Sequence, residues 1–314
     1  MTIRIYKSTD AGAPQLDRSL GSLINVLDAC LVNGFGAGPT ATPLGWSKAF
    51  SATNQAAYQM AGGSQRFLLV HDDISNGDVA KVWGYESMSA IDTGVDKWPV
   101  FAPSLDGLFW YKNEDAGYNA DWQIIGDEAG FYFIRFLTDG PENRSHNHWM
   151  NYFGDGIALN SGDDWMTHVG GHYLDSFTGD TNAEFSSFRE LASSSQTNPI
   201  WAIRDFTGTA TNTPMGRESF AINSGTVSSS TSSTAATSAP AARPIAVPAY
   251  MTQPEGVRGR YPGLLLPLVA EYNCTHGDTV SFEGVDYFKA RLQGESSSDI
   301  RCTFYIQITG DWRA

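Results

Sequence analysis

The segment Trp122-Gln-Ile-Ile-Gly-Asp-Glu-Ala-Gly-Phe-Tyr-Phe-Ile-Arg-Phe-Leu137 decides the fold class of this 314-residue chain. It contains two apolar runs, Trp122–Ile125 and Phe131–Leu137, and the acidic pair Asp127-Glu128 between them is typical of a hairpin turn. A third run, Leu108–Tyr111, comes before them, beyond another turn-rich stretch. We therefore predict an antiparallel meander that contains one strand buried on both faces.

Other parts of the chain carry the same signal. The runs Arg66–His71 and Val79–Tyr85 flank a turn-rich segment and predict a β-hairpin. Cys302–Thr309 alternates apolar and polar residues, which predicts a strand with one dry face and one wet face. The 32 glycines and 14 prolines favour many turns. The predicted fold class is mainly β (α+β), with antiparallel β-sheets and one docked N-terminal amphipathic helix.

The predicted helix lies in the run Gly21-Ser-Leu-Ile-Asn-Val-Leu-Asp-Ala-Cys-Leu-Val-Asn-Gly-Phe35. Its apolar residues recur at spacings of three and four and share one face: Leu23, Ile24, Leu27, Cys30 and Leu31. The opposite face consists of Ser22, Asn25, Asp28 and Ala29. Asn33-Gly34 tolerates a left-handed backbone past the helix end, and we expect Phe35 to fold back onto the last turn. One face of the helix is therefore predicted to pack against a core.

Composition divides the chain into four segments. Residues 1–60 form an N-terminal strand, helix and aromatic segment, and residues 61–224 form a β-rich body. Residues 225–248 are dominated by Ser, Thr, Ala and Pro, which cannot bury enough apolar surface to offset backbone ordering. This segment is predicted to be a linker or an arm. Residues 249–314 form a C-terminal β segment, which we expect to complete the sheet of the body rather than to fold alone.

The charge balance restricts the partners. A formal net charge of -14 repels polyanions, so we expect no nucleic-acid partner. The first residues, Met1–Lys7, lack the apolar region of a signal peptide, and no run approaches the roughly 18 apolar residues that span a bilayer. We therefore expect neither export by a signal peptide nor membrane insertion.

Three cysteines cannot form a dense disulfide framework. Cys274 and Cys302 flank strand-like segments and could pair with each other, while Cys30 lies on the helix. Reduced core thiols are the preferred interpretation.

Four histidines are the candidate metal ligands: His146, His148, His168 and His172. Alternate residues share one face of a strand and residues four apart share one face of a helix, so both pairs have a spacing compatible with a metal. The neighbouring Trp149 and Trp165 suit a packed aromatic loop equally well, with the histidines as hydrogen-bonded structural residues. We prefer this second interpretation and expect neither metal nor cofactor.

The sequence offers little for catalysis. It has no Gly-x-Ser-x-Gly elbow, no phosphate-binding Gly-Lys-Ser/Thr loop and no dinucleotide glycine fingerprint after a strand. With 34 acidic residues many carboxylate pairs are conceivable, but Asp127-Glu128 and Asp163-Asp164 both suit turns. We predict that the protein is not an enzyme.

The nine tryptophans could form a carbohydrate platform, because flat aromatic faces stack on sugar rings. Trp83, Trp110 and Trp122 lie in strand-like runs and are predicted to be core residues. The candidates for glycan binding are therefore the tryptophans predicted to lie in loops, which are Trp98, Trp149 and Trp165.

The run Arg258-Gly-Arg-Tyr-Pro-Gly-Leu-Leu-Leu-Pro-Leu268 has two prolines that argue against a regular central strand, and an apolar stretch that must be covered. It either lines the protein's own core or forms a subunit contact, and we prefer the first interpretation. The interface candidates are Arg258, Arg260, Tyr261, Leu264, Leu265 and Leu266.

Four stretches resemble a family of structural (virion) proteins of tailed bacteriophages: Arg4–Asp10, Gly21–Gly36, Gly45–Tyr58 and Gly256–Leu268. The resemblance implies a non-catalytic particle component, such as a tail or neck accessory protein or a head decoration protein. Its partners would be copies of itself, in a homo-oligomer, and other virion proteins, after synthesis in the host cytoplasm. The alternative is a protein that recognises host surface glycans, either as a receptor-binding protein or as a cell-surface polysaccharide depolymerase.

Overall fold

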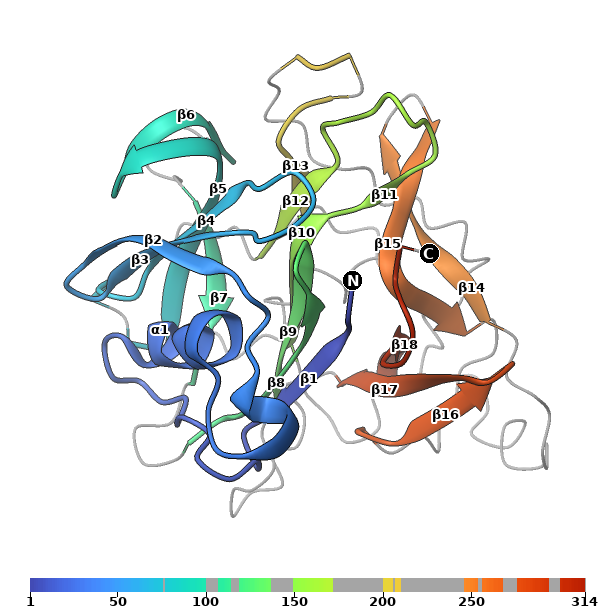
Figure 1. Cartoon of the computed structure of the whole chain (residues 1–314), viewed down its shortest axis with the longest axis horizontal. Coiled ribbons are helices and arrows are strands. Elements are labelled where there is room, and N and C mark those ends of the chain that lie inside the picture. The colour runs from blue at the N-terminus through green and yellow to red at the C-terminus, as the bar shows by residue number, and fades with distance from the viewer. Residues whose placement is uncertain are drawn as a thin grey trace.

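The computed structural model describes residues 1–75, 77–99, 107–113, 119–136, 149–171, 200–205, 207–209, 246–253, 256–267, 276–293 and 300–313. They form three six-stranded antiparallel sheets and one short N-terminal α-helix. Figure 1 shows the sheets as three neighbouring layers, which we call the N-terminal, central and C-terminal sheets. The prediction of a mainly β fold with one docked N-terminal helix is confirmed.

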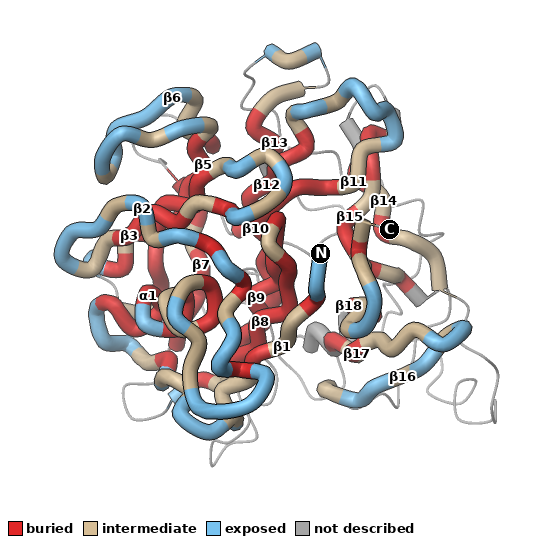
Figure 2. The backbone as a smooth tube through the Cα atoms, in the orientation of Figure 1, coloured by how far each residue is buried: buried red, intermediate tan, exposed pale blue. Residues whose placement is uncertain are grey.

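The central sheet has the strand order β1-β8-β9-β10-β12-β13. Its strands are β1 (Arg4–Lys7), β8 (Asp121–Asp127), β9 (Gly130–Phe136), β10 (Trp149–Asp155), β12 (Thr167–Gly170) and β13 (Ile200–Ala202). β8 and β9 form the predicted hairpin, with Ile124 opposite Phe133. Every residue of β9 is buried, as the red tube in Figure 2 shows, so the prediction of a strand buried on both faces is confirmed.

The N-terminal sheet has the order β2-β3-β4-β5-β6, and β7 also pairs with β5. Its strands are β2 (Ser47–Ala52), β3 (Gln55–Gln59), β4 (Phe67–His71), β5 (Val79–Ala90), β6 (Thr93–Trp98) and β7 (Leu108–Tyr111). β4 and β5 are the predicted hairpin. β7 pairs with the start of β5 and not with β8, so the expected meander is divided between two sheets. β3 pairs with β4, so this sheet continues across the segment boundary expected at residue 60.

The C-terminal sheet has the order β11-β15-β18-β17-β16, with β14 also beside β15. Its strands are β11 (Ile157–Ala158), β14 (Ala246–Gln253), β15 (Gly256–Pro267), β16 (Thr279–Phe282), β17 (Val285–Gln293) and β18 (Ile300–Gln307). β18 is the strand predicted at the C-terminal end. Tyr305, on its expected wet face, is buried against Phe282. The C-terminal strands thus form a sheet to which the body contributes β11.

β15 corrects one expectation, because it is a strand despite its prolines. It pairs with β11 at Gly259 and Arg260, and with β18 at Leu264 and Leu265. Pro262 lies between these two paired stretches, and the register with β14 is also shifted there. A residue without an N–H group therefore falls where the neighbouring strands change, and its missing donor costs no ladder bond.

The helix has the predicted buried face. α1 (Ser22–Leu27) continues into a π-helical stretch at Asp28–Asn33, and a short 3-10 helix follows at Gly38–Ala41. The five predicted core residues of this run are all buried. Ser22, expected on the wet face, is buried too because its hydroxyl donates to the carbonyl of Asp17. Phe35 packs against Tyr6 and Trp122, in the apolar cluster that also contains the buried face of the helix.

Side chains of the central sheet alternate between two cores. Phe131 and Phe133 of β9 join the helix and the N-terminal sheet in one apolar cluster, which we call the N-terminal interface. Tyr132 and Ile134 join the C-terminal sheet in another, the C-terminal interface. The period of two along a strand explains why one apolar run serves both. The central sheet is therefore the middle layer of a three-layer sandwich.

Two expectations concern the remaining segments. Residues 225–245 of the predicted linker lie outside the described residues, and residues 246–248 begin β14. Cys274 and the side chain of Cys302 are also outside the described part, so their pairing stays a prediction. Among the described residues, no helix has the length and apolar character needed to cross a membrane.

Candidate functional site

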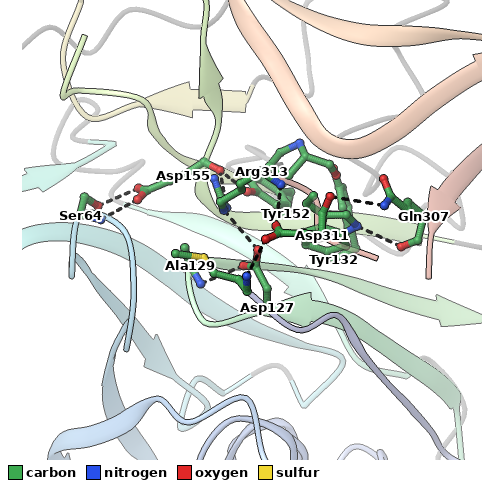
Figure 3. Close-up of polar contacts among 12 residues, drawn as sticks. Ser64, Asp127, Ala129, Tyr132, Tyr152, Asp155, Gln307, Asp311 and Arg313 are labelled. Atoms are coloured by element: carbon green, nitrogen blue, oxygen red, sulfur yellow. Dashed lines mark hydrogen bonds and ion pairs between the residues drawn. The ribbon is translucent and has the colours of Figure 1, made fainter. Parts of the chain in front are cut away.

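A network of charged and hydroxyl side chains joins the three sheets at one end of the central sheet (Figure 3). Its members, which we call the polar clasp, are Ser64, Asp127, Asp155, Thr167 and Arg313. Ser64 lies in the turn between β3 and β4, while Asp127 and Asp155 end β8 and β10. Thr167 begins β12, and Arg313 follows β18. These residues are far apart in sequence, so tertiary structure alone brings them together.

The carboxylate of Asp155 is the centre of the polar clasp. It accepts hydrogen bonds from the backbone N–H of Ser64 at 2.6 Å and from its hydroxyl at 2.7 Å. The hydroxyl of Thr167 donates to it at 2.6 Å. Gly63 permits this approach, because a Cβ there would lie 2.2 Å from Asp155 Oδ2 and the residue has a φ of +60°. The N-terminal sheet is thereby fixed to the end of β10.

Arg313 connects the C-terminal end of the chain to the same point. Its Nε donates to Asp127 Oδ2 at 3.2 Å, and an Nη donates to the carbonyl of Asp155 at 3.0 Å. Asp127 is fully buried, and its second oxygen accepts the backbone N–H of Ala129 in the β8–β9 turn. Burial lowers the pKa of Arg313, but the oxygens of Tyr152, Asp127 and Asp155 outweigh it and leave this pKa raised. The guanidinium is therefore a permanent charge in the clasp.

Both ends of the chain are fastened beside the clasp. The amino group of Met1 forms an ion pair with Asp311 at 2.7 Å. This hydrogen bond raises the pKa of the amino group and lowers that of Asp311. Trp312 is buried over Gly263, where a Cβ would lie 2.2 Å from the indole nitrogen. Its ring meets Tyr132 edge-on at 5.5 Å, so the last residues cover the C-terminal interface.

The hydrogen-bonding groups of the polar clasp are directed at one another. The hydroxyl of Ser64 donates to the carboxylate of Asp155, which also accepts from the backbone N–H of Ser64 and from the hydroxyl of Thr167. No described histidine forms a hydrogen bond with Ser64. His168 follows Thr167 in β12, so its ring points to the other face of the sheet, near Tyr261. Burial raises the pKa of Tyr152 well above its usual value, and its hydroxyl donates to the carbonyl of Asp155. These groups are arranged as donors and acceptors for one another.

A second polar cluster surrounds Trp165. Arg204 donates to Glu86 at 2.8 Å and also pairs with Asp96, while Arg66 pairs with Glu86 at 3.0 Å. The pKa of Glu86 is lowered, since these arginines outweigh the effect of its partial burial. The guanidinium carbons of Arg66 and Arg204 lie 5.3 and 4.5 Å from the centroid of the Trp165 ring. Both cations thus interact with the ring and with Glu86.

Arg258 forms an ion pair and several hydrogen bonds to backbone carbonyls. Its Nε and an Nη donate to the two carboxylate oxygens of Asp163 at 2.5 and 2.7 Å. It also donates to the carbonyls of Arg204, Trp165 and Asp205. The side chains of Arg258 and Asp163 are only 3% and 4% exposed. A bidentate pair in this setting fixes β15 to the loop before β12.

The three tryptophans proposed for glycan binding differ in their solvent exposure. The prediction that Trp98 and Trp149 lie in loops is wrong, because Trp98 ends β6, Trp149 begins β10 and both are 2% exposed. Turn residues beside them in sequence gave the misleading signal, while neighbouring sheets cover their rings. Trp165 alone is partly exposed, and the two arginines lie against its ring.

The histidines do not form a metal site in the part of the chain that is described. His146, His148 and His172 lie outside the described residues. His168 is fully buried in β12, and neither of its ring nitrogens has a hydrogen-bond partner of normal geometry. Burial, together with the positive charge of Arg258, lowers its pKa to about 3. No group of three potential ligands occurs among the described residues.

The interface candidates of β15 face inward for the most part. Arg258, Tyr261, Leu264 and Leu266 are buried within the chain. Arg260 and Leu265 are half-buried. The inward side of β15 lies on the C-terminal interface, so its apolar side chains are covered by the central sheet. This is the intramolecular arrangement that the sequence favoured.

Sequence reasoning missed the polar clasp. The sequence predicts a hairpin turn at Asp127 and places Asp155 among the acids that could supply oxygen ligands near the histidines, while Ser64 and Arg313 carry no signal. Ser64 and Asp155 are 91 residues apart, and Asp127 and Arg313 are 186 apart. The one local hint is the pair Gly62-Gly63, which marks a close approach of the backbone to another group.

Comparison with known proteins gives no relative. No protein-family model matches the chain, and no curated protein matches it either. The resemblance to tailed-bacteriophage structural proteins therefore depends on the four stretches quoted above.

Proposed function

We propose that this protein is a non-catalytic structural component of a tailed-bacteriophage particle. It would act through contacts with copies of itself and with other virion proteins, as a tail or neck accessory protein or a head decoration protein. The four stretches that resemble such proteins support this function, and they lie on β1, the helix, β2–β3 and β15. Each of these elements belongs to the sandwich.

The polar clasp is the observation that carries the proposal. Buried charged groups in an enzyme are arranged toward a substrate, whereas here they join layers of the same chain. Arg313 reaches Asp127 and Asp155, and Arg258 reaches Asp163. The amino group of Met1 pairs with Asp311 next to the clasp. Such internal bonding suits a protein that must hold one shape within an assembly.

The test is quantitative mass spectrometry of purified particles from the phage that encodes the chain. We expect peptides of this protein in a fixed ratio of several copies per particle, which persists through a density gradient. Light scattering on the purified protein should give a homo-oligomer. Particles without these peptides, from infections in which the protein is abundant, would refute the proposal.

Glycan recognition is the second candidate, and Trp165 is the residue that favours it. Its partly exposed ring lies among charged side chains that could hydrogen-bond sugar hydroxyls. A glycan array tests this, with Trp165→Ala as the variant and the buried Trp98→Phe as the control. Binding that only Trp165→Ala abolishes would support this candidate, and sugar release from host envelopes would indicate a depolymerase.

A further inference from the structure

The most deeply buried ion pair of the described residues lies in the N-terminal sheet, away from the polar clasp. Asp72 follows β4 and Lys112 follows β7, and both of these strands pair with β5. Lys112 Nζ lies 2.5 Å from Asp72 Oδ1, and both side chains are 0% exposed. Lys112 Nζ also donates to the carbonyl of Ser19 at 2.9 Å. An amine and a carboxyl group are thus held in contact in a site without water access.

We propose that Asp72 and Lys112 condense to an intramolecular isopeptide bond in the folded chain. The proposal concerns the chemistry of this pair and does not depend on the proposed function.

The surroundings favour the neutral forms that the reaction needs. The amine adds to Cγ only in its unprotonated form, and the contact lets the ammonium proton pass directly to Asp72 in an apolar interior where separated charges are costly. Burial raises the pKa of Asp72, although Lys112 and the N–H groups at the helix start oppose this effect. No third carboxyl group contacts the pair among the described residues, so the proton passes directly between the two partners.

The geometry orients the attack. Because Oδ1 is bonded to Cγ, an amine in hydrogen-bond contact with it lies about 3–3.5 Å from Cγ, and a rotation of the carboxyl group about its Cβ–Cγ bond places Nζ above the carboxyl plane for the attack. The backbone N–H of Leu23 donates to Asp72 Oδ2 at 2.8 Å. That N–H stabilises the negative charge that develops on Oδ2 when the amine adds to Cγ. The start of the helix therefore supplies the donor of an oxyanion site.

The reaction needs no further reactant. The Nζ lone pair forms the C–N bond, the Cγ–Oδ1 bond breaks, and Oδ1 leaves as water. Both hydrogens of that water come from the original ammonium group, one by the first proton transfer and one as the intermediate collapses. One amide N–H remains. The product joins the ends of β4 and β7, which are 40 residues apart in sequence, by a covalent bond.

The test is the intact mass of the denatured full-length protein, followed by a tryptic map. We expect a population one water lighter than the sequence, which increases on incubation. Trypsin does not cut after an acylated lysine, so Phe67–Lys81 should appear joined to Trp98–Arg135 in a branched peptide. The full sequence mass after long incubation, with only linear peptides at Asp72 and Lys112, would overturn the proposal.

Two controls isolate the pair. Lys112→Arg keeps a cation but removes the nucleophile, so its mass should equal that of its sequence. A lighter Lys112→Arg protein would assign the loss of water to another site and overturn the proposal. Within the same molecule, Lys48 lies 2.7 Å from Asp28, but these side chains are 28% and 22% exposed. Because water solvates this second pair, trypsin should cut after Lys48 throughout.

Discussion

The two faces of the central sheet are held to their neighbours by different interactions. The N-terminal interface is formed mainly by aromatic and aliphatic side chains and encloses the helix, and the hydrogen bonds from Ser64 to the carboxylate of Asp155 border it. The C-terminal interface has its own apolar core, but it also contains the buried His168 and is bordered by Arg258 and Arg313. Apolar packing responds little to pH, whereas bonds that involve titrating groups do. The C-terminal sheet should therefore separate from the central sheet before the N-terminal sheet does.

The largest effect is expected from Trp110→Ala in the N-terminal interface. Trp110 is fully buried, stacks on Phe133 at 5.5 Å and donates to the carbonyl of Gly170. Loss of the ring leaves a cavity and an unpaired carbonyl, so the free energy of unfolding should fall by about 4 kcal/mol. Urea denaturation followed by circular dichroism measures it. Trp110→Phe retains a ring and should lose clearly less; equal losses would mean that packing is not the cause.

Arg258→Ala should be the most damaging change at the C-terminal interface. It leaves the carboxylate of Asp163 buried without its partner, which costs about 3 kcal/mol. Arg260→Ala, two residues along β15 and half-buried, is the matched control and should cost under about 0.5 kcal/mol. The measurement is denaturant unfolding of both variants under the same conditions. Similar losses in both variants would contradict the assigned role of the Arg258–Asp163 pair.

Sequence analysis predicted the parts of these two interfaces that depend on local patterns and missed the parts that depend on contacts between distant residues. The strands β4, β5, β8, β9 and β18 could be predicted because apolar runs and turn residues are local patterns. The sequence could not show that Leu108–Tyr111 and the next strand belong to different sheets, because an apolar run of this kind fits a buried position in either sheet. Trp149 shows the same limit, since its neighbours in sequence resemble a loop while its cover comes from Tyr111, 4.2 Å away between ring centroids. No sequence pattern connects Arg313 with Asp127, because the two residues are 186 positions apart.

Acidification should weaken the C-terminal interface through His168. Its pKa is lowered from 6.5 to about 3 in the folded protein, so the unfolded chain binds a proton that the folded chain does not. Stability from this residue is complete above about pH 6.5 and falls by about 1.4 kcal/mol per pH unit below it, so that roughly 2–3 kcal/mol is lost at pH 4.5. Unfolding measured at pH 7 and pH 4.5 should show the loss in the wild type. His168→Gln should show a smaller pH dependence, and an unchanged dependence would exclude this residue as the source.

Arg313→Ala is expected to have a smaller effect. Its side chain is 17% exposed, and its loss removes the bonds to Asp127 and to the carbonyl of Asp155. Asp127 keeps the N–H of Ala129 as a donor, so we expect a loss of about 2 kcal/mol, with faster hydrogen exchange confined to the C-terminal sheet. Asp311→Asn, at the exposed ion pair with Met1, should have no resolvable effect on unfolding. A uniform increase of exchange in all three sheets of Arg313→Ala would contradict a local role.

The most direct test is hydrogen exchange of the full-length protein, resolved by strand and recorded at pH 7 and pH 5. It measures whether the C-terminal sheet separates from the central sheet before the N-terminal sheet does. We predict that acidification speeds exchange in β15, β17 and β18, while β4, β5, β8 and β9 keep their protection. Loss of protection in all of these strands together, or first in the N-terminal sheet, would contradict the account.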